Sequence, residues 1–184
     1  RNLIGFDFAF SYPFYDKCCY FPGIKDSPIN SEKLWQLIED NNTNAKNFYG
    51  GEIWASKTYG KFFNSPKLKG SHFASRRRCT ERLAKNKILS PSPTFNCVGP
   101  GAVGTGTLAG MRILNLLKNK VKIWPFDELN FSTKTVVVEI FPSYYFRLSK
   151  IKPEKKMGYT IENINLSLEF FNSKPLKKNQ IIGG

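Results

Sequence analysis

The sequence predicts an α/β domain, because strand-like and helix-like segments alternate along a chain with enough apolar residues for a core. Two runs rich in aromatic or β-branched residues, Asn2–Phe10 and Lys134–Phe141, are typical of strands, and a proline follows soon after each. Apolar residues recur at helical spacing in three segments, Ser31–Asp40, Leu108–Lys118 and Thr160–Asn172. The 184 residues, of which 41% are hydrophobic, suffice for one domain with a real core.

The helix over Ser31–Asp40 has a serine that can cap its first turn and Glu32 at its positive end. The arginine-rich segment Ser75–Lys87 is predicted to form a short basic helix. Prolines at Ser90–Pro93 then break the chain before a glycine-rich stretch. The remaining segments are rich in turn residues, so we expect loops there.

The charge is strongly positive, with 28 Lys and Arg against 14 Asp and Glu, a formal net charge of +14. Such a charge attracts anions, which makes nucleic acid or another polyanion the expected partner. An anionic membrane surface is the rival, but no apolar run approaches the roughly 18 residues of a spanning helix, and no signal-peptide pattern is present. The four cysteines lack CxxC spacing and there is one His, so we expect neither zinc nor a disulfide framework, and a cytoplasmic protein.

The positive charge is concentrated between Lys57 and Lys87, a segment that contains ten Lys or Arg residues and only one acid. We expect Arg76, Arg77 and Arg78 to hold phosphates, and the interleaved aromatics are candidates for stacking on bases: Tyr59, Phe62, Phe63 and Phe73. The alternative is a solvated basic loop.

Two carboxylates, Asp7 in IGFDFAF and Glu139 in VVVEIFP, lie in otherwise apolar strand-like runs. A charged group there is costly unless it is paired or binds a cation, so the two acids are candidate Mg²⁺ ligands and catalytic residues. The alternative is that either acid points outward or pairs with an arginine.

The glycine-rich stretch offers a third candidate site. Gly104, Thr105 and Gly106 precede a helix whose free N–H groups can receive a phosphate. The stretch is not a Walker loop, because no Gly-Lys-Ser/Thr follows. The alternative is a capped loop in which Thr105 or Thr107 is the cap.

The order of five motifs, IGFDFAFSYPF, SRRRCTERL, VGPGAVGTGTLAGMRIL, IWPF and VVVEIFPS, resembles one family over most of Leu3 to Tyr145. This is the predicted nuclease family with a ribonuclease H-like fold catalogued as domain of unknown function 429. The resemblance implies a ribonuclease H-like mixed sheet with helices. In a single domain over residues 1–184, residues 11–133 would form a long basic insertion and connecting helices between two core strands.

Residue by residue, Asp7 and Glu139 match acids of the family's strand motifs. Arg78 and Glu81 match its Arg-x-x-acid segment, in which Glu81 replaces the usual Asp. The resemblance implies hydrolysis of phosphodiesters by clustered carboxylates that hold two Mg²⁺ ions. The family's first strand and last helix, each with a further acid, fall outside this sequence, so we expect a fold that is incomplete at both ends. We also expect nucleic-acid binding with poor cleavage.

The sequence therefore predicts a metal-dependent nuclease or a related nucleic-acid-processing protein. Two alternatives remain open. One is a non-catalytic nucleic-acid-binding module on a decayed nuclease fold. The other is an enzyme that acts on a small phosphorylated substrate at the glycine-rich helix start.

Overall fold

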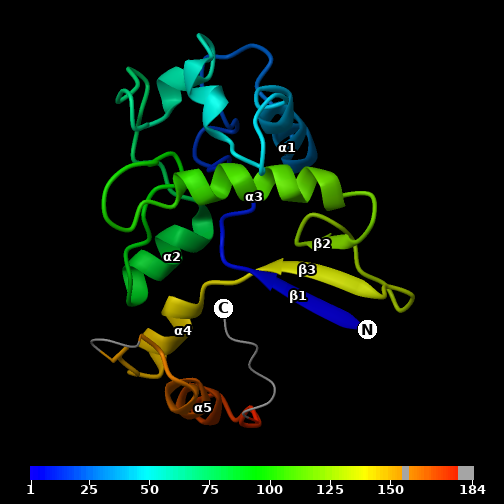
Figure 1. Cartoon of the computed structure of the whole chain (residues 1–184), viewed down its shortest axis with the longest axis vertical. Helices are drawn as coiled ribbons and strands as arrows, with labels where there is room; N and C mark the ends of the chain where they lie inside the picture. Colours follow the sequence, from blue (N-terminus) through cyan, green and yellow to red (C-terminus); the bar gives the residue numbers. More distant parts are fainter. Residues whose placement is uncertain (155–157, 178–184) are drawn as a thin grey trace. The chain divides into compact units, whose positions relative to one another are not determined.

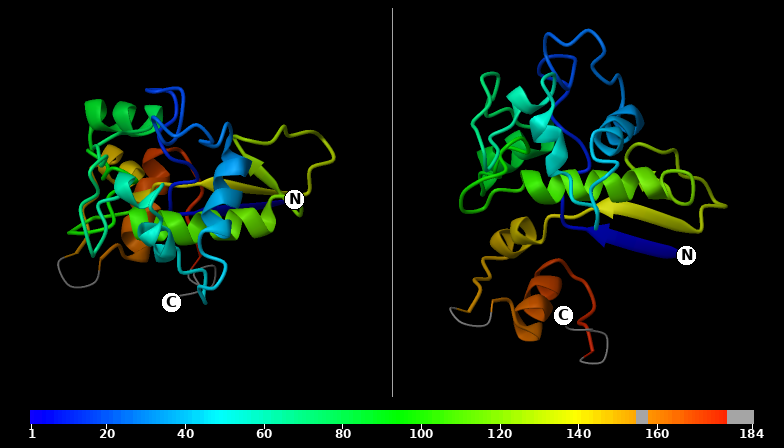
Figure 2. Two further views of the ribbon diagram at one scale, coloured as in Figure 1. Left: turned by 90° about the horizontal axis from the view of Figure 1, so that it is seen from above. Right: turned by 45° about the horizontal axis from the view of Figure 1, so that its top comes forward.

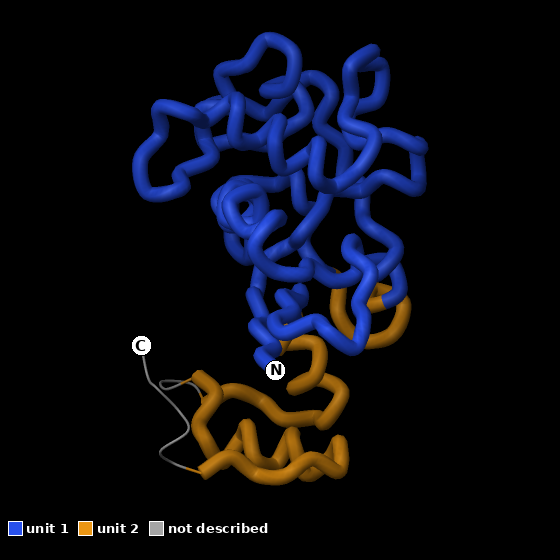
Figure 3. Tube along the Cα trace, turned by 90° about the vertical axis from the view of Figure 1, so that its right-hand side faces the viewer, with its two compact units in different colours: residues 1–83, 91–140 blue, residues 84–90, 141–184 orange. Residues whose placement is uncertain are grey.

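A computed structural model of the chain describes residues 1–154 and 158–177 (Figure 1). The chain divides into two compact units, which are coloured separately in Figure 3: unit 1 comprises residues 1–83 and 91–140, and unit 2 comprises residues 84–90 and 141–184. The helices and strands of the described residues are, in chain order, β1 (Asn2–Phe6), α1 (Ser31–Asp40), the 3₁₀ turns η1 (Gly51–Ala55) and η2 (Gly60–Phe62), α2 (Cys79–Lys87), α3 (Gly104–Leu117), β2 (Lys122–Trp124), β3 (Thr135–Glu139), α4 (Pro142–Leu148) and α5 (Ile161–Phe170).

The strands of unit 1 form a three-stranded sheet in the order β1-β3-β2. Both pairings are parallel, with Phe6 opposite Glu139 and Ile123 opposite Val137. The predicted α/β class is therefore confirmed. The expected mixed sheet is not found, because all the strands in the described residues run in the same direction. Strand β2, within the 11–133 segment expected to hold an insertion and connecting helices, was not predicted from the sequence.

Strand β1 is shorter and more exposed than the sequence predicts. It ends at Phe6, and it lies at the edge of the sheet with Leu3 73% and Ile4 41% exposed. The apolar residues that follow leave the sheet and enter the core as irregular chain, so that Phe10 is fully buried. A run of apolar residues indicates burial, but it does not distinguish a strand from a buried loop.

The core of unit 1 lies between the sheet and two helices. Helix α3 runs along one side of the sheet and packs against α1 (Figures 1 and 2). The helix contributes Leu108, Met111 and Leu114, and the sheet contributes Ile123 and Val137, all fully buried. Burial of a Leu or Met side chain stabilises a fold by about 1.5–3 kcal/mol, so this layer supplies a large share of the hydrophobic free energy.

A second group of buried side chains in unit 1 is aromatic. Tyr12 stacks on Phe95 with ring centroids 4.2 Å apart, and Phe21 and Phe63 meet Phe95 edge to face. Edge-to-face and offset-stacked pairs add roughly 0.5–1.5 kcal/mol beyond their buried area. These contacts fix long stretches of irregular chain that hydrogen-bonded ladders do not hold.

Helix ends differ from the predictions in ways that have local causes. Helix α1 has the predicted bounds, but its cap is Asn30, whose side chain accepts from the Lys33 N–H, while Ser31 is buried. Helix α3 begins at Gly104, so the idea that Thr105 or Thr107 caps it is wrong, since both lie inside the helix.

Two other helices differ from the predictions. The predicted basic helix begins only at Cys79. Helix α4 was missed because Pro142 begins a helix as well as ending a strand.

Unit 2 contains α4 and α5, which contact each other. Phe146 and Tyr159 stack with centroids 3.8 Å apart, and the Ser149 hydroxyl donates to the Ser167 hydroxyl oxygen. Helix α5 confirms the predicted C-terminal helix, and Thr160 caps it. Across residues 1–154 and 158–177, none of the helices has the length and apolar character needed to cross a membrane.

Two glycines of α3 provide a matched test of the packing. A Cβ on Gly110 would collide with the Phe8 ring, whereas a Cβ on Gly106 would meet open space. Because Ala gains roughly 0.5–1 kcal/mol over Gly in either helix position, Gly106→Ala should raise the free energy of unfolding by about that amount. Gly110→Ala should lower it. Urea unfolding measures both, and stabilisation by Gly110→Ala would contradict the described packing of Phe8 on α3.

Candidate active site

The two predicted acids lie at the same edge of the sheet. Glu139 is the last residue of β3, and Asp7 comes one residue after the end of β1. Because β1 and β3 are parallel neighbours, their carboxyl ends meet, and Figure 1 shows the two arrowheads side by side. Partial burial raises the pKa of Asp7, and the negative charge of Glu139 raises it further. Asp7 and Glu139 therefore both lie at the carboxyl end of the sheet.

Glu139 is held by an arginine. Its carboxylate accepts two hydrogen bonds of 2.6 Å from Arg78, from Nη1 to Oε2 and from Nη2 to Oε1. The backbone N–H of Phe10 donates a third bond, of 2.9 Å, to Oε2. The Arg78 and Glu139 side chains are only 16% and 28% exposed, so this is a largely desolvated bidentate pair. The alternative that one of the acids pairs with an arginine is thus confirmed for Glu139.

Arg78 also binds the first turn of α2. Its Nε donates to Glu81 at 2.8 Å, and its backbone N–H donates to the other Glu81 oxygen at 3.0 Å. Burial alone would lower the pKa of Arg78, but the bonds to Glu139 and the charges of both glutamates raise it above its usual value. One guanidinium therefore binds two carboxylates, so the three side chains together have a formal net negative charge.

The fit of this site to Mg²⁺ can be judged from its donors. Asp7 accepts no hydrogen bond from the part of the chain that the structure describes. Burial and the charge of Glu139 raise its pKa, and a bound cation would stabilise its ionised form. Glu139 is already neutralised by Arg78. Within the described ranges, no three His, Cys, Asp or Glu side chains lie close enough to hold a metal together. The donors fit one loosely held cation beside Asp7 and Glu139, and they do not fit two.

Arg76 uses its guanidinium inside the protein. It forms an ion pair of 2.7 Å with Asp16 and donates to the backbone carbonyl oxygens of Pro13, Cys19 and Tyr20 at 2.6–2.8 Å. These bonds close the loop that follows β1, and they direct the donors away from any ligand. Arg77 is half-buried and donates to the Pro91 carbonyl oxygen at 3.2 Å. The sequence did not reveal Asp16 as a partner, because no spacing rule connects residues 60 positions apart.

The glycine-rich helix start is explained by close packing. A Cβ on Gly104 would meet the Cys97 sulfur and the backbone oxygens of Thr94 and Asn96, and the Gly104 N–H already donates to Asn96 O at 2.9 Å. The Thr105 hydroxyl donates to the Cys97 carbonyl oxygen at 3.4 Å. A Cβ on Gly106 would meet open space, and Thr105 and Gly106 are both exposed, whereas Gly104 is buried. Among the described residues, no hydrogen bond joins this stretch to Asp7 or Glu139.

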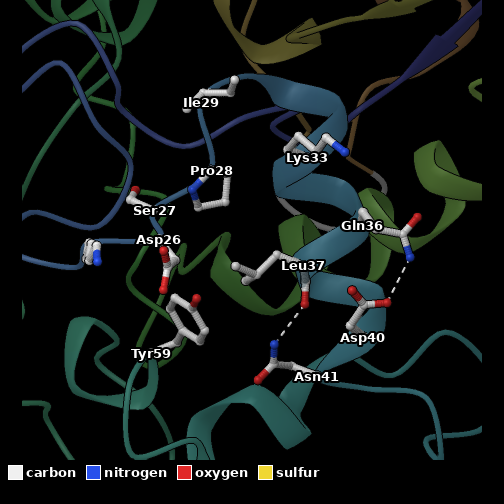
Figure 4. Close-up of a pocket in the computed structure, with 11 residues that line it drawn as sticks. Asp26, Ser27, Pro28, Ile29, Lys33, Gln36, Leu37, Asp40, Asn41 and Tyr59 are labelled. Atoms are coloured by element: carbon white, nitrogen blue, oxygen red, sulfur yellow. Dashed lines mark hydrogen bonds between the residues drawn. The ribbon is translucent and has the colours of Figure 1, made fainter.

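A separate open pocket of unit 1 lies between the 25–29 loop, α1 and Tyr59 (Figure 4). Gln36 donates to Asp40 at 2.8 Å along its wall, and Lys33 and Asp26 give it charges of both signs. Of its lining residues only Tyr59, a candidate for base stacking, was singled out from the sequence. A wide, mixed-charge hollow of this kind lacks the convergent polar groups of an enclosed ligand site.

Comparisons with protein-family models, with curated proteins and with solved structures find no significant match for this chain.

The Arg78–Glu139 pair can be tested with a double-mutant cycle. Arg78→Met leaves two largely buried carboxylates without their cation, so it should lower the free energy of unfolding by roughly 3 kcal/mol. Glu139→Met should lower it by less, and the double variant should cost less than the sum. A coupling energy above about 1.5 kcal/mol from urea unfolding is the expected result. A coupling near zero would show that the pair is not formed in solution.

The Arg76–Asp16 pair predicts a pH dependence. Its hydrogen bonds with Arg76 hold the pKa of Asp16 below its usual value, so the ionised form stabilises the fold. That stabilisation is fully present above the unfolded pKa of about 3.9 and is lost as the pH falls through the lower folded pKa. Asp16→Asn should therefore cost about 1–2 kcal/mol at pH 7 and progressively less below about pH 4. A cost that does not change between pH 7 and pH 3 would contradict the assignment.

Proposed function

We propose that the protein is a metal-dependent, ribonuclease H-like nuclease that acts on nucleic acid. It would hydrolyse phosphodiester bonds in a site formed by Asp7 and Glu139. The observation that carries this proposal is the position of Asp7 and Glu139 at the carboxyl ends of adjacent parallel strands. That edge is where open α/β sheets bind their ligands. The net charge of +14 supports a polyanionic substrate.

In this proposal Asp7 and Glu139 would hold a single Mg²⁺, which supplies a Lewis acid that polarises a phosphoryl oxygen. Arg78 acts on the site through Glu139. Its bidentate bonds fix the orientation of the carboxylate, while the N–H of Phe10, in the chain that follows β1, donates to Oε2 of the same carboxylate. Arg78 is thus a positioning residue, and Asp7 is the acid whose oxygens remain directed to a ligand.

We expect the hydrolysis of phosphodiester bonds by this site to be slow. A two-metal mechanism needs several carboxylates to balance the charge of both cations. Here Arg78 already neutralises Glu139, and Glu81 is committed to Arg78. One cation provides less stabilisation of the attacking and leaving oxygens than two provide.

The neutralisation of Glu139 also favours a second candidate function, a nucleic-acid-binding module without catalysis. In that case Arg78 would serve stability alone, and Asp7 would be an exposed acid with no role in a reaction. The two candidates differ in whether a metal ion changes the fate of a bound substrate.

The test is a cleavage time course on single-stranded and duplex DNA and RNA with Mg²⁺, Mn²⁺ or a chelator. We expect slow cleavage that a chelator abolishes and that Asp7→Asn reduces by at least about 100-fold, because a neutral amide cannot replace a charged metal ligand. Glu128→Gln, the matched change at an exposed acid outside the site, should have no effect.

Binding of the same substrates, measured with the chelator present, should be unchanged in the Asp7 variant. Binding without any metal-dependent cleavage would support the non-catalytic module. Cleavage that Asp7→Asn leaves intact would place the active site elsewhere.

A further inference from the structure

The cations of the basic segment 57–87 divide into two sets. Arg76 and Arg78 are bound to acids inside unit 1. In contrast, Lys57, Lys67 and Lys69 are exposed, and none of them forms an ion pair with any described residue. Arg82, Lys85 and Lys87, which follow the arginine triplet, are exposed as well, and the last two belong to unit 2. The exposed cations of the segment that lie in unit 1 before the triplet are therefore lysines.

These lysines lie on one compact segment, residues 56–73, which we call the lysine loop. The Gly60 N–H donates to Ser56 O at 2.8 Å, and the His72 N–H donates to Lys61 O at 2.9 Å. Gly70 N donates to Phe63 O at 2.8 Å, and Gly70 packs so closely on the Lys61 backbone that a Cβ would collide there. The loop is therefore folded back on itself, with the Lys61 backbone against Gly70, which directly follows Lys69.

The aromatic residues of the lysine loop point inward, which corrects the expectation that they stack on bases. Phe62 is 5% exposed and Phe63 is fully buried, while Tyr59 and Phe73 pack against the core. Lys61 Nζ lies 5.7 Å from the centroid of the Phe62 ring, and Lys69 Nζ lies 5.6 Å from that of Phe73. The rings anchor the loop and carry lysines on their faces.

The lysine loop contains no acidic residue. No Asp or Glu occurs between Glu52 and Glu81 in the sequence. Ammonium groups on a scaffold that buried rings hold in place lose less backbone freedom on binding than groups on a flexible tail. This combination suits the repeated charges of a phosphate backbone.

We propose that the lysine loop binds the sugar–phosphate backbone of nucleic acid through Lys57, Lys67 and Lys69, without stacking on bases. The inference rests on the proposed function for its class of substrate, and it assigns the binding surface for that substrate. It moves the main phosphate contacts from the arginine triplet to the lysines. Binding is then independent of base sequence and strongly dependent on salt.

The first experiment is fluorescence anisotropy of labelled oligonucleotides at several salt concentrations, with a chelator present. Changing Lys57, Lys67 and Lys69 together to Gln should reduce the slope of log K against log salt on duplex DNA by up to about 2.7, roughly 0.9 for each lost contact. The matched control changes Lys120, Lys122 and Lys134, which are also exposed, to Gln. Its slope should fall by less than about 1. Equal losses in the two variants would overturn the proposal in favour of net charge alone.

The second experiment tests the absence of stacking. A single strand with abasic sites should bind within about threefold of the intact strand, since stacking contributes about 1–3 kcal/mol for each base where it occurs. A loss above about tenfold for the abasic strand would overturn this part. Vesicles of phosphatidylserine are the third arm, and tighter binding to them than to duplex DNA through the same lysines would assign the loop to membranes instead.

The results separate this proposal from the nuclease proposal. Loss of binding in the lysine variant with no metal-dependent cleavage by the unmodified chain supports the lysine loop and rejects the nuclease. Metal-dependent cleavage and an unchanged salt slope in the lysine variant support the nuclease and reject the lysine loop.

Discussion

The bidentate ion pair between Arg78 and Glu139 is the interaction on which the arrangement of unit 1 depends. It joins the end of β3 to the start of α2, and the Phe10 N–H ties the same carboxylate to the segment that follows β1. Charged groups with so little exposure are stable only when each has its partner, so removal of one member leaves the others with a desolvation penalty. Three segments that are far apart in sequence are thereby brought to one edge of the sheet.

The same interaction limits the chemistry that this edge can support. Arg78 shares its charge between Glu139 and Glu81, which leaves Asp7 as the acid whose carboxylate accepts no bond from the described residues. The site is therefore suited to a single cation. Arg76 and Arg78 form ion pairs within unit 1, whereas Lys57, Lys67 and Lys69 of the lysine loop face solvent, where we propose that they bind a polyanion.

Features with local causes were predictable from the sequence. Helices α1 and α5 and strand β3 follow from periodicity and β-branched composition, and Arg78 and Glu81 have the spacing of a helical ion pair.

Features that depend on tertiary contacts were not predictable. Phe8, Phe10 and Tyr12 have the composition of a strand but fill the core as loop, and β2 has only three residues, too few for a pattern. The Arg76–Asp16 pair and the inward direction of Phe62 and Phe63 also depend on segments that meet only in the folded chain.

The most direct test of the central claim is a crystal structure of the chain with Mn²⁺, in which anomalous scattering locates the metal. One ion is expected beside Asp7 and Glu139, with both Arg78–Glu139 bonds still in place. Two ions at this edge with Arg78 displaced, or no ion bound to Asp7, would contradict it.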